Sequence, residues 1–304
     1  TIRSVTIDAA PVSGNWAINQ LKAELPGRTR FEAKGVLQVG DNFGFDGKLL
    51  MASRQPSGLA AWLTDSVDDA IRRIRGAGFS GDVSLHDELQ KVDNLELALG
   101  GASLKGALVR SARGDSLPLT RLKLEGGALD ADALQAFSAL FGSNASGSGS
   151  DILKGQDLDV DLKAGPVTHD GFAAETLDTA FRLRDGVFDI DRLTVGNVAG
   201  TTITATGKLE PFRTEPSGSI DATLLSGDMA PFIGALAKRF PDFPFLVAMN
   251  ERAARFPGLF EETQLSVLAN TLQDKSGANE FSLSAAGRSG GMDVTLSGTN
   301  EINE

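Results

Sequence analysis

Cysteine and tyrosine are absent from this chain, and only two of its 304 residues are histidine. The lack of cysteine excludes disulfide bonds, thiolate metal ligands and a cysteine nucleophile. The side chains that most often perform acid–base chemistry are therefore scarce. We expect no metal site, no cofactor and no catalytic residue, so the protein is not expected to be an enzyme.

Long apolar runs and an excess of positive charge are missing too. No stretch approaches the ~20 apolar residues that span a bilayer, and no signal peptide is visible. The net charge of −11 argues against a nucleic-acid partner, which requires a basic stripe, and against docking on anionic membranes by charge alone. The chain starts at Thr1 without methionine, and we interpret it as a piece of a longer protein whose targeting segment could lie outside it.

Apolar and polar residues alternate along most of the chain, which is the pattern of strands with one wet face. The alternation is clear over residues 31–39, 43–51, 157–163 and 202–209. It predicts a mainly β fold, an elongated and curled antiparallel sheet of about fifteen strands built from repeated hairpins and shaped as a groove. A parallel sheet is not expected.

One strand–turn–strand phrase recurs along the chain and is usually followed by a helix. Gly35 lies in the first copy, Gly207 in a close repeat, and Gly106 and Gly287 in looser ones. Repetition of one such unit is typical of a stacked sheet. A stacked sheet with one apolar face must cover that face or use it.

A few short amphipathic helices interrupt the strands. The first is expected from Leu59 to Ile74, others begin near Asp132 and Met229, and a further short segment lies within 244–257. The expected N-caps are Ser57, Asp130 and Asp228. Trp62 and Phe232 are expected in the first turns of their helices, where aromatic side chains usually anchor a helix on its sheet. Contact with lipid or a partner is the alternative for both aromatics.

The clearest break in the chain is the Gly/Ser-rich run 143–150, which is typical of flexible coil. It separates a β region with two helices, 1–142, from a second β region with one or two helices, 151–304. Strands of the same style resume at once, so we interpret the two regions as one elongated unit with a flexible loop. A linker between separate domains is the alternative.

Residues that could carry chemistry are isolated. His86 and His169 each precede an aspartate, but both lie in polar stretches at predicted strand ends, and we interpret them as solvated turns. The acidic clusters 41–47 and 185–191 lack the spaced ligands of a calcium loop and alternate with apolar residues, as on the wet face of a strand.

Loose phrases of glycine and apolar spacing occur at residues 45–53 followed by 59–63, at residues 95–106, at residues 126–134, and at residues 190–193 leading through Gly200 to 207–209. None of them is a catalytic signature. In their order along the chain, these phrases resemble the AsmA family of bacterial envelope proteins, and the resemblance covers most of the chain.

The resemblance implies a periplasmic module of a protein anchored in the inner membrane by a segment that this chain lacks. It implies a curled sheet whose apolar interior carries phospholipid acyl chains between the inner and outer membranes and supports outer-membrane assembly, with other envelope proteins as possible partners. The candidate groove residues are Phe31, Leu37, Val39, Phe43, Phe45, Leu49, Met51, Leu95, Leu97, Leu99, Leu104, Leu108, Leu158, Val160, Leu162 and Ile203.

Two other classes of function remain open. In the first, the helices seal the apolar face and the sheet edges bind an envelope protein by strand addition. In the second, the chain is an enzyme, such as a hydrolase, that uses acidic residues; two carboxylates converging in a deep pocket would be its mark. An uncovered apolar face favours lipid, and a face packed shut favours the interaction module.

Overall fold

The computed structural model describes residues 2–40, 43–64, 67, 69–114, 116–139, 155–210, 217–273 and 279–302. The chain divides into two compact units, Thr1–Asp170 and Gly171–Glu304. The division follows the Gly/Ser-rich run rather than falling within it, and the run itself lies outside the described residues. We call the two parts unit 1 and unit 2 and describe each by itself.

Strands dominate the structure, at 67% against 15% helix, which confirms the predicted β-rich class with an even larger share of strand than expected. The strands of unit 1 are β1 (Arg3–Val12), β2 (Asn15–Leu25), β3 (Thr29–Gln38), β4 (Gly44–Ser53), β5 (Ala77–His86), β6 (Leu89–Leu99), β7 (Ala102–Arg113), β8 (Ser116–Gly126), β9 (Leu129–Asp130), β10 (Asp157–Ala164) and β11 (Val167–His169). Those of unit 2 are β12 (Phe172–Ala174), β13 (Thr176–Arg184), β14 (Val187–Val198), β15 (Thr201–Glu210), β16 (Ser217–Asp228), β17 (Glu261–Gln273), β18 (Asn279–Ser289) and β19 (Met292–Ile302).

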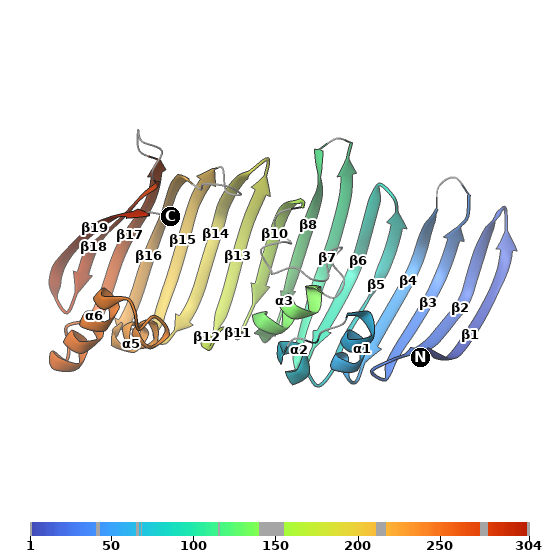
Figure 1. Cartoon of the computed structure of the whole chain (residues 1–304), viewed down its shortest axis with the longest axis horizontal. Coiled ribbons are helices and arrows are strands. Elements are labelled where there is room, and N and C mark those ends of the chain that lie inside the picture. The colour runs from blue at the N-terminus through green and yellow to red at the C-terminus, as the bar shows by residue number, and fades with distance from the viewer. Residues whose placement is uncertain are drawn as a thin grey trace. The chain divides into compact units, whose positions relative to one another are not determined.

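Each unit is built on an open sheet in which neighbours in sequence pair in space (Figure 1). In unit 1 the order is β1-β2-β3-β4-β5-β6-β7-β8-β10, and in unit 2 it is β13-β14-β15-β16-β17-β18-β19. Consecutive strands from β1 to β8 and from β13 to β19 are antiparallel. Short turns join most of these strands, as the hairpin pattern of the sequence predicts, whereas the connections from β4 to β5 and from β16 to β17 contain helices.

Two strand pairs of unit 1 depart from the expected antiparallel meander, because β11 is parallel to β9 and β10 is parallel to β8. β10 pairs parallel with β8, with Leu158 opposite Thr120 and Leu162 opposite Leu124. The buried carboxylate of Asp157 accepts a hydrogen bond from Arg113, at the end of β7, and this pair fixes the start of β10 beside the start of β8. A parallel pair requires a crossover, and the segment between the two strands includes helix α3. Alternation within a strand predicts its wet face but not the direction of its neighbour.

Among the described residues, helices lie at the four predicted places in the chain, but their lengths differ from the prediction. They are α1 (Pro56–Leu63), α2 (Asp69–Arg73), α3 (Ala131–Ala139), α5 (Ala230–Arg239) and α6 (Pro244–Arg255). The helix expected to continue to Ile74 is divided into α1 and α2, and it begins at Pro56 after Gln55 rather than after a Ser57 cap, because proline favours the first helical position.

One of the predicted caps is present, because Asp130 Oδ1 accepts the Ala133 N–H at 2.9 Å. Asp228 is not the N-cap of α5: Met229 occupies that position without a side-chain cap, and Asp228, one residue earlier, accepts the Ala230 N–H at 2.9 Å. The predicted continuation of α3 toward Gly142 lies outside the described residues.

The core of unit 1 gathers where the strands meet the helices. Leu59 of α1 is 1% exposed and packs with Met51, Ala77 and Leu99 at the ends of β4, β5 and β6. Half-buried residues around this cluster come from β2, β3, β5, β6 and α3 and from the residue after α2; they are Leu25, Phe31, Ile74, Phe79, Leu97 and Leu134. The helices therefore cover one end of the sheet face.

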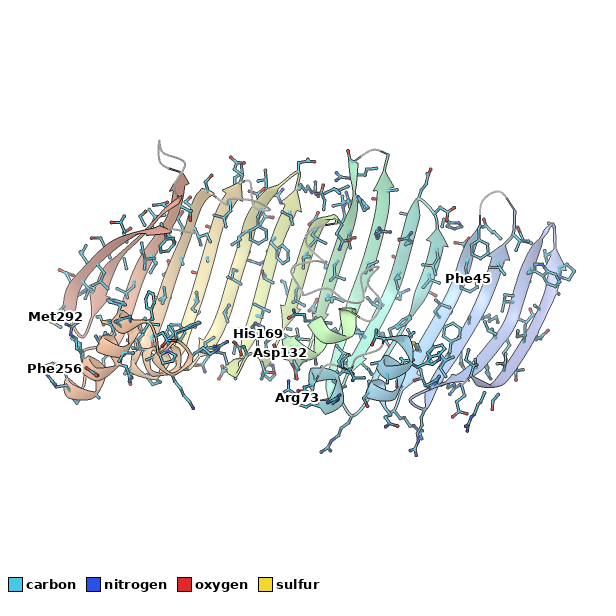
Figure 2. All side chains as sticks on the ribbon, in the orientation of Figure 1. Phe45, Arg73, Asp132, His169, Phe256 and Met292 are labelled. Carbon is cyan, nitrogen blue, oxygen red and sulfur yellow. The ribbon has the colours of Figure 1, made fainter. Side chains whose placement is uncertain are left out.

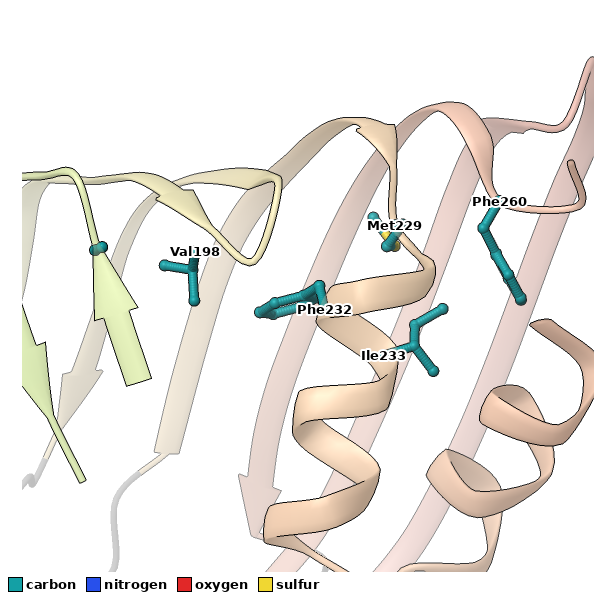
Figure 3. Packing of buried hydrophobic residues seen from close by; sticks show 6 residues of the cluster. Val198, Met229, Phe232, Ile233 and Phe260 are labelled. Carbon is teal, nitrogen blue, oxygen red and sulfur yellow. The ribbon is translucent and has the colours of Figure 1, made fainter. Parts of the chain in front are cut away.

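Unit 2 repeats this arrangement with α5 (Figure 3). Phe232 and Ile233 of α5 pack with Val198, Met229 and Phe260 from the strand ends. Phe232 thus anchors its helix as expected. Trp62 does not: it lies in the last turn of α1 and is 45% exposed, because α1 begins earlier than predicted.

Glycines of the repeated phrase let neighbouring strands approach closely. Gly35 and Gly47 lie opposite one another in β3 and β4, and a Cβ on Gly35 would lie 2.1 Å from the Asp46 carbonyl oxygen. At Gly106 the Lys123 carbonyl oxygen would be 1.8 Å away. No real Cβ tolerates such distances. The repeat is therefore a device of strand pairing rather than of a binding loop.

Candidate functional site

The register places the apolar positions of unit 1 on one face of its sheet, which we call the apolar face. Leu37 lies opposite Phe45, and Phe45 opposite Leu85. Farther across the sheet, Val92 lies opposite Leu108, and Leu108 opposite Leu122. Rows of large apolar side chains thus cross the strands.

The candidate groove residues of unit 1 divide between a covered and an open part of this face. Phe31, Met51, Leu97 and Leu99 belong to the helix-covered cluster. Leu104 and Leu158 are also buried, at 1% and 7% exposure. These positions are core, so they are poor candidates for contact with a ligand.

The other candidates on the strands keep part of their surface. We call the half-buried residues outside the helix-covered cluster the open part of the apolar face. It consists of Leu37, Phe45, Leu49, Leu85, Val92, Leu95, Leu108, Leu122, Val160 and Leu162. Among the described residues, no helix side chain belongs to a buried cluster with them.

Val39 and Phe43 do not lie on the face. β3 ends at Gln38 and β4 begins at Gly44, so both residues flank the turn between these strands, where they are 42% and 61% exposed. The alternation of apolar and polar residues continues through Val39 and Phe43 in the sequence, but both residues lie outside the strands. In unit 2 the candidate Ile203 packs against the α5 cluster and is core rather than groove.

Three members of the open part were missed from the sequence as candidates, namely Leu85, Val92 and Leu122. Their strands follow the same period of two, which was a usable signal. An extra residue in β6, between Val92 and Leu95, shifts the alternating pattern by one residue within that strand, whereas β5 keeps strict alternation. A bulge of this kind interrupts the period of two, so strict alternation does not reveal that the apolar face is continuous.

Polar side chains bound the open part at the end of the strands away from the helices. Gln90 lies opposite Leu85 and beside Arg110, whose Nη1 donates to Gln90 Oε1 at 2.9 Å. Thr120 follows in the next strand and donates to Gln156 at 2.7 Å. The apolar face therefore ends in one exposed guanidinium and a short row of amides and hydroxyls.

The opposite face of unit 1 is charged and solvated. Lys48 and Asp82 pair across β4 and β5 at 3.4 Å, and Lys105 and Glu96 pair across β6 and β7 at 2.9 Å. These cross-strand pairs support the register, although exposed pairs contribute little individually. The sheet of unit 1 therefore has one apolar face and one charged, solvated face.

His86 lies at the end of β5, as predicted, but its partner is not the adjacent Asp87. His86 Nε2 is 3.2 Å from Asp46 Oδ1, and Ser84 Oγ donates to the same oxygen at 2.6 Å. Chiefly the Ser84 hydrogen bond, and then His86 and Gln38, lower the pKa of Asp46. Serine and histidine both bind the carboxylate and not one another, so this cluster lacks the serine–histidine contact of a nucleophilic triad.

His169 pairs with Asp132 rather than with Asp170 (Figure 2). Its Nδ1 is 2.7 Å from Asp132 Oδ1, and Asp132 Oδ2 accepts the Asp170 N–H at 3.0 Å. That backbone hydrogen bond, followed by His169, lowers the pKa of Asp132. The contact joins the first turn of α3 to the end of β11 and is exposed, which fits a structural link.

Unit 2 has an open hollow of about 470 Å³ over strands β14 to β19. Hydroxyl side chains of Thr204, Thr223 and Ser266 share its lining with the carboxylates of Asp191 and Asp221. Asp191 Oδ1 accepts a hydrogen bond from Arg182 Nη2 at 2.6 Å, so this carboxylate already has a cationic partner.

Within the residues that the structure describes, no group of three or more histidine, aspartate or glutamate side chains could hold a metal ion. In the same part of the chain, no helix is long and apolar enough to cross a bilayer. The expected independence from metals and cofactors stays a prediction.

Comparison of the chain with protein-family models, with curated proteins and with solved structures finds no match. The resemblance to the AsmA family therefore stays an interpretation of the sequence phrases. The geometry of the apolar face of unit 1 is therefore the main evidence on function.

Proposed function

We propose that this chain is a non-catalytic module that holds phospholipid acyl chains on the open part of the apolar face. The observation that carries the proposal is the limited reach of the helices, which pack over one end of the unit 1 sheet among the described residues. Beyond that end, rows of leucine, valine and phenylalanine remain only half-buried. Soluble proteins seldom leave a contiguous apolar surface without a use for it.

The chemistry of the face suits acyl chains. A methylene group exposed to water costs about 0.8 kcal/mol, and an apolar row removes that cost at each step along a chain. The boundary at Arg110 and Gln90 gives a phosphate group a cation and amide donors at the wet end. A single guanidinium recognises phosphate without reading the rest of a headgroup, so low selectivity among phospholipids is expected.

The setting of this activity follows from the resemblance to the AsmA family. We propose that the module works in the periplasm, that an inner-membrane segment outside this chain anchors it, and that it moves phospholipid between the inner and outer membranes. Support for outer-membrane assembly, alone or with other envelope proteins, is part of the same proposal.

Site-directed photo-crosslinking tests the proposal. A photoreactive amino acid at Leu49, Val92 or Leu108 is expected to form adducts with phospholipid during expression in a bacterial envelope, because these positions lie on the open part. The same amino acid at Lys48 or Lys105, on the charged face, is the matched control and is expected to form none. Leu97 is unsuitable as a probe, since it packs in the helix-covered cluster.

An interaction module is the second candidate, and the free edge of unit 1 favours it. Among the described residues, β1 pairs with β2 alone, and its residues are exposed except for the half-buried Ala9. Val5 and Ile7 are 56% and 64% exposed. An unprotected edge strand of this kind can accept a strand from another protein. Adducts with protein at β1, and none with lipid at positions 49, 92 and 108, would favour this alternative.

A further inference from the structure

We infer that the hairpin of α5 and α6 in unit 2 is a contact site for an anionic bilayer surface. The hairpin, residues 230–256, carries an unusual set of exposed aromatic side chains. Phe240, Phe243, Phe245 and Phe256 are 49%, 57%, 47% and 54% exposed. The inference stands on this hairpin alone and does not require the apolar face of unit 1 to hold lipid.

Packing explains why these aromatic side chains are available. α5 is fixed to the sheet by Phe232, Ile233 and Ala237, which are buried. α6 has no buried residue and touches the core of unit 2 only through the half-buried Met249 and Ala253. The phenylalanines are therefore not needed to hold the helices on the sheet.

The exposed aromatics extend around the end of the hairpin. An open cleft of about 530 Å³ lies where the two helices join and is lined by Arg239, Phe240, Pro241, Asp242, Phe243 and Leu246. The Arg239 guanidinium lies over the Phe240 ring, 5.4 Å from its centre. Phe256 at the end of α6 and the exposed Met292 at the start of β19 lie at the same end of unit 2 (Figure 2). The cleft and its rim offer apolar surface with a cation at its edge.

The charge of the hairpin favours an anionic partner. The hairpin holds the cations Lys238, Arg239, Arg252 and Arg255 against the anions Asp242 and Glu251, so its net charge is 4 − 2 = +2 in a chain of net charge −11. Within the described part of the chain, no carboxylate forms an ion pair with Lys238, Arg252 or Arg255. The acidity of the whole chain had argued against anionic membranes, but the distribution of charge decides local binding.

Aromatic side chains between exposed cations are the pattern of segments that lie in a membrane interface. The rings enter the boundary between headgroups and acyl chains, and the basic side chains bind lipid phosphates. A protein partner would instead require a flat complementary patch of roughly 800 Å² on this side. Exposed rings beside exposed cations at the end of the hairpin favour a bilayer interface.

Vesicle sedimentation with the full chain tests the inference. Wild type is expected to bind vesicles rich in phosphatidylglycerol and to bind pure phosphatidylcholine vesicles far less. The double variant Phe243→Ser/Phe245→Ser is expected to lose about tenfold in partition coefficient, because it removes inserted apolar area. The triple variant Lys238→Gln/Arg252→Gln/Arg255→Gln is expected to lose the preference for phosphatidylglycerol. Leu63→Ser/Leu225→Ser removes comparable exposed apolar residues elsewhere and is expected to leave binding unchanged.

A spectroscopic readout keeps the test decisive if a variant folds poorly. The chain has no cysteine, so Phe243→Cys can be labelled with a polarity-sensitive dye at one site. Its emission is expected to shift to the blue with phosphatidylglycerol vesicles, whereas a label at Glu88→Cys in unit 1 is not. Equal partition of wild type and the Phe243/Phe245 variant, or no shift at position 243, would overturn the inference. Lipid adducts at positions 49, 92 and 108 are a separate measurement, so either proposal can fail without the other.

Discussion

At the scale of single residues, the repeated glycines are explained by distance. Each accommodates the backbone of the neighbouring strand where a Cβ would lie within about 2 Å of a carbonyl oxygen, as at Gly106 and Gly35. The spacing of these glycines was evident in the sequence. Its cause was not, because strand register is a property of the pairing and not of either strand.

Gly106→Ala is expected to destabilise the protein by about 2 kcal/mol or more, since the strand pair must separate to admit the methyl group. Gly101→Ala is the matched control, because nothing lies within 4 Å of its Cβ position and its backbone conformation suits alanine. The control is expected to be neutral or slightly stabilising. Chemical denaturation measures both; equal stability of the two variants would refute the close-approach account.

Asp132 should give the stability a small pH dependence. Its pKa is lowered in the folded state by the Asp170 N–H and by His169, so its contribution is complete above the unfolded pKa and is lost as pH falls below about 4. Solvent screening at this exposed site limits the effect to less than about 1 kcal/mol.

Asp132→Asn is expected to remove this contribution. The difference in unfolding free energy between wild type and the variant should be constant near neutral pH and shrink between pH ~4 and pH ~2. A difference that grows on acidification would show that Asp132 is not stabilised as a carboxylate.

At the scale of elements, helices decide which part of a sheet face is core. The sequence predicted where helices occur but not how far they reach over the strands. From the sequence, Leu97 and Leu49 are equivalent candidates for the groove, because both occupy apolar positions of alternating strands. The structure separates them, since Leu97 meets the helix-covered cluster and Leu49 does not.

Other differences at this scale have physical causes. The parallel pairing of β10 depends on the buried ion pair of Asp157 with Arg113, two residues far apart in the sequence. The partners of His86 and His169 come from other strands and helices, which adjacency in sequence could not indicate. Local patterns predicted the strands well and one of the three caps, at Asp130, whereas contacts between distant segments required the fold.

Leu59→Ala is expected to cost about 2–5 kcal/mol, because Leu59 is 1% exposed and its removal leaves a cavity under α1. Leu49→Ala removes the same atoms from the open part of the face and is expected to cost less than about 1.5 kcal/mol. Thermal or denaturant unfolding of the two variants compares them directly. Equal losses would mean that the open part is as tightly packed as the covered part.

At the scale of the whole molecule, the composition excluded several classes of function without naming one. Absent cysteine and scarce histidine are consistent with a binding role. Although the net charge of the chain is negative, the hairpin of α5 and α6 in unit 2 is basic and carries exposed aromatic side chains. Two lipid-facing surfaces, one on each unit, are therefore proposed from different features.

Mass spectrometry of phospholipid that co-purifies with the chain tests the central claim most directly. Wild type, Leu49→Asp/Val92→Asp and the charged-face control Lys48→Asp/Lys105→Asp would be purified from the same bacterial envelope, and bound phospholipid measured per mole of folded protein. We expect phospholipid with wild type and with the control, and a loss of at least about fivefold in Leu49→Asp/Val92→Asp with folding retained, because carboxylates on an open face meet water yet repel acyl chains. Wild type without bound phospholipid, or Leu49→Asp/Val92→Asp that binds as much as wild type, would contradict the account.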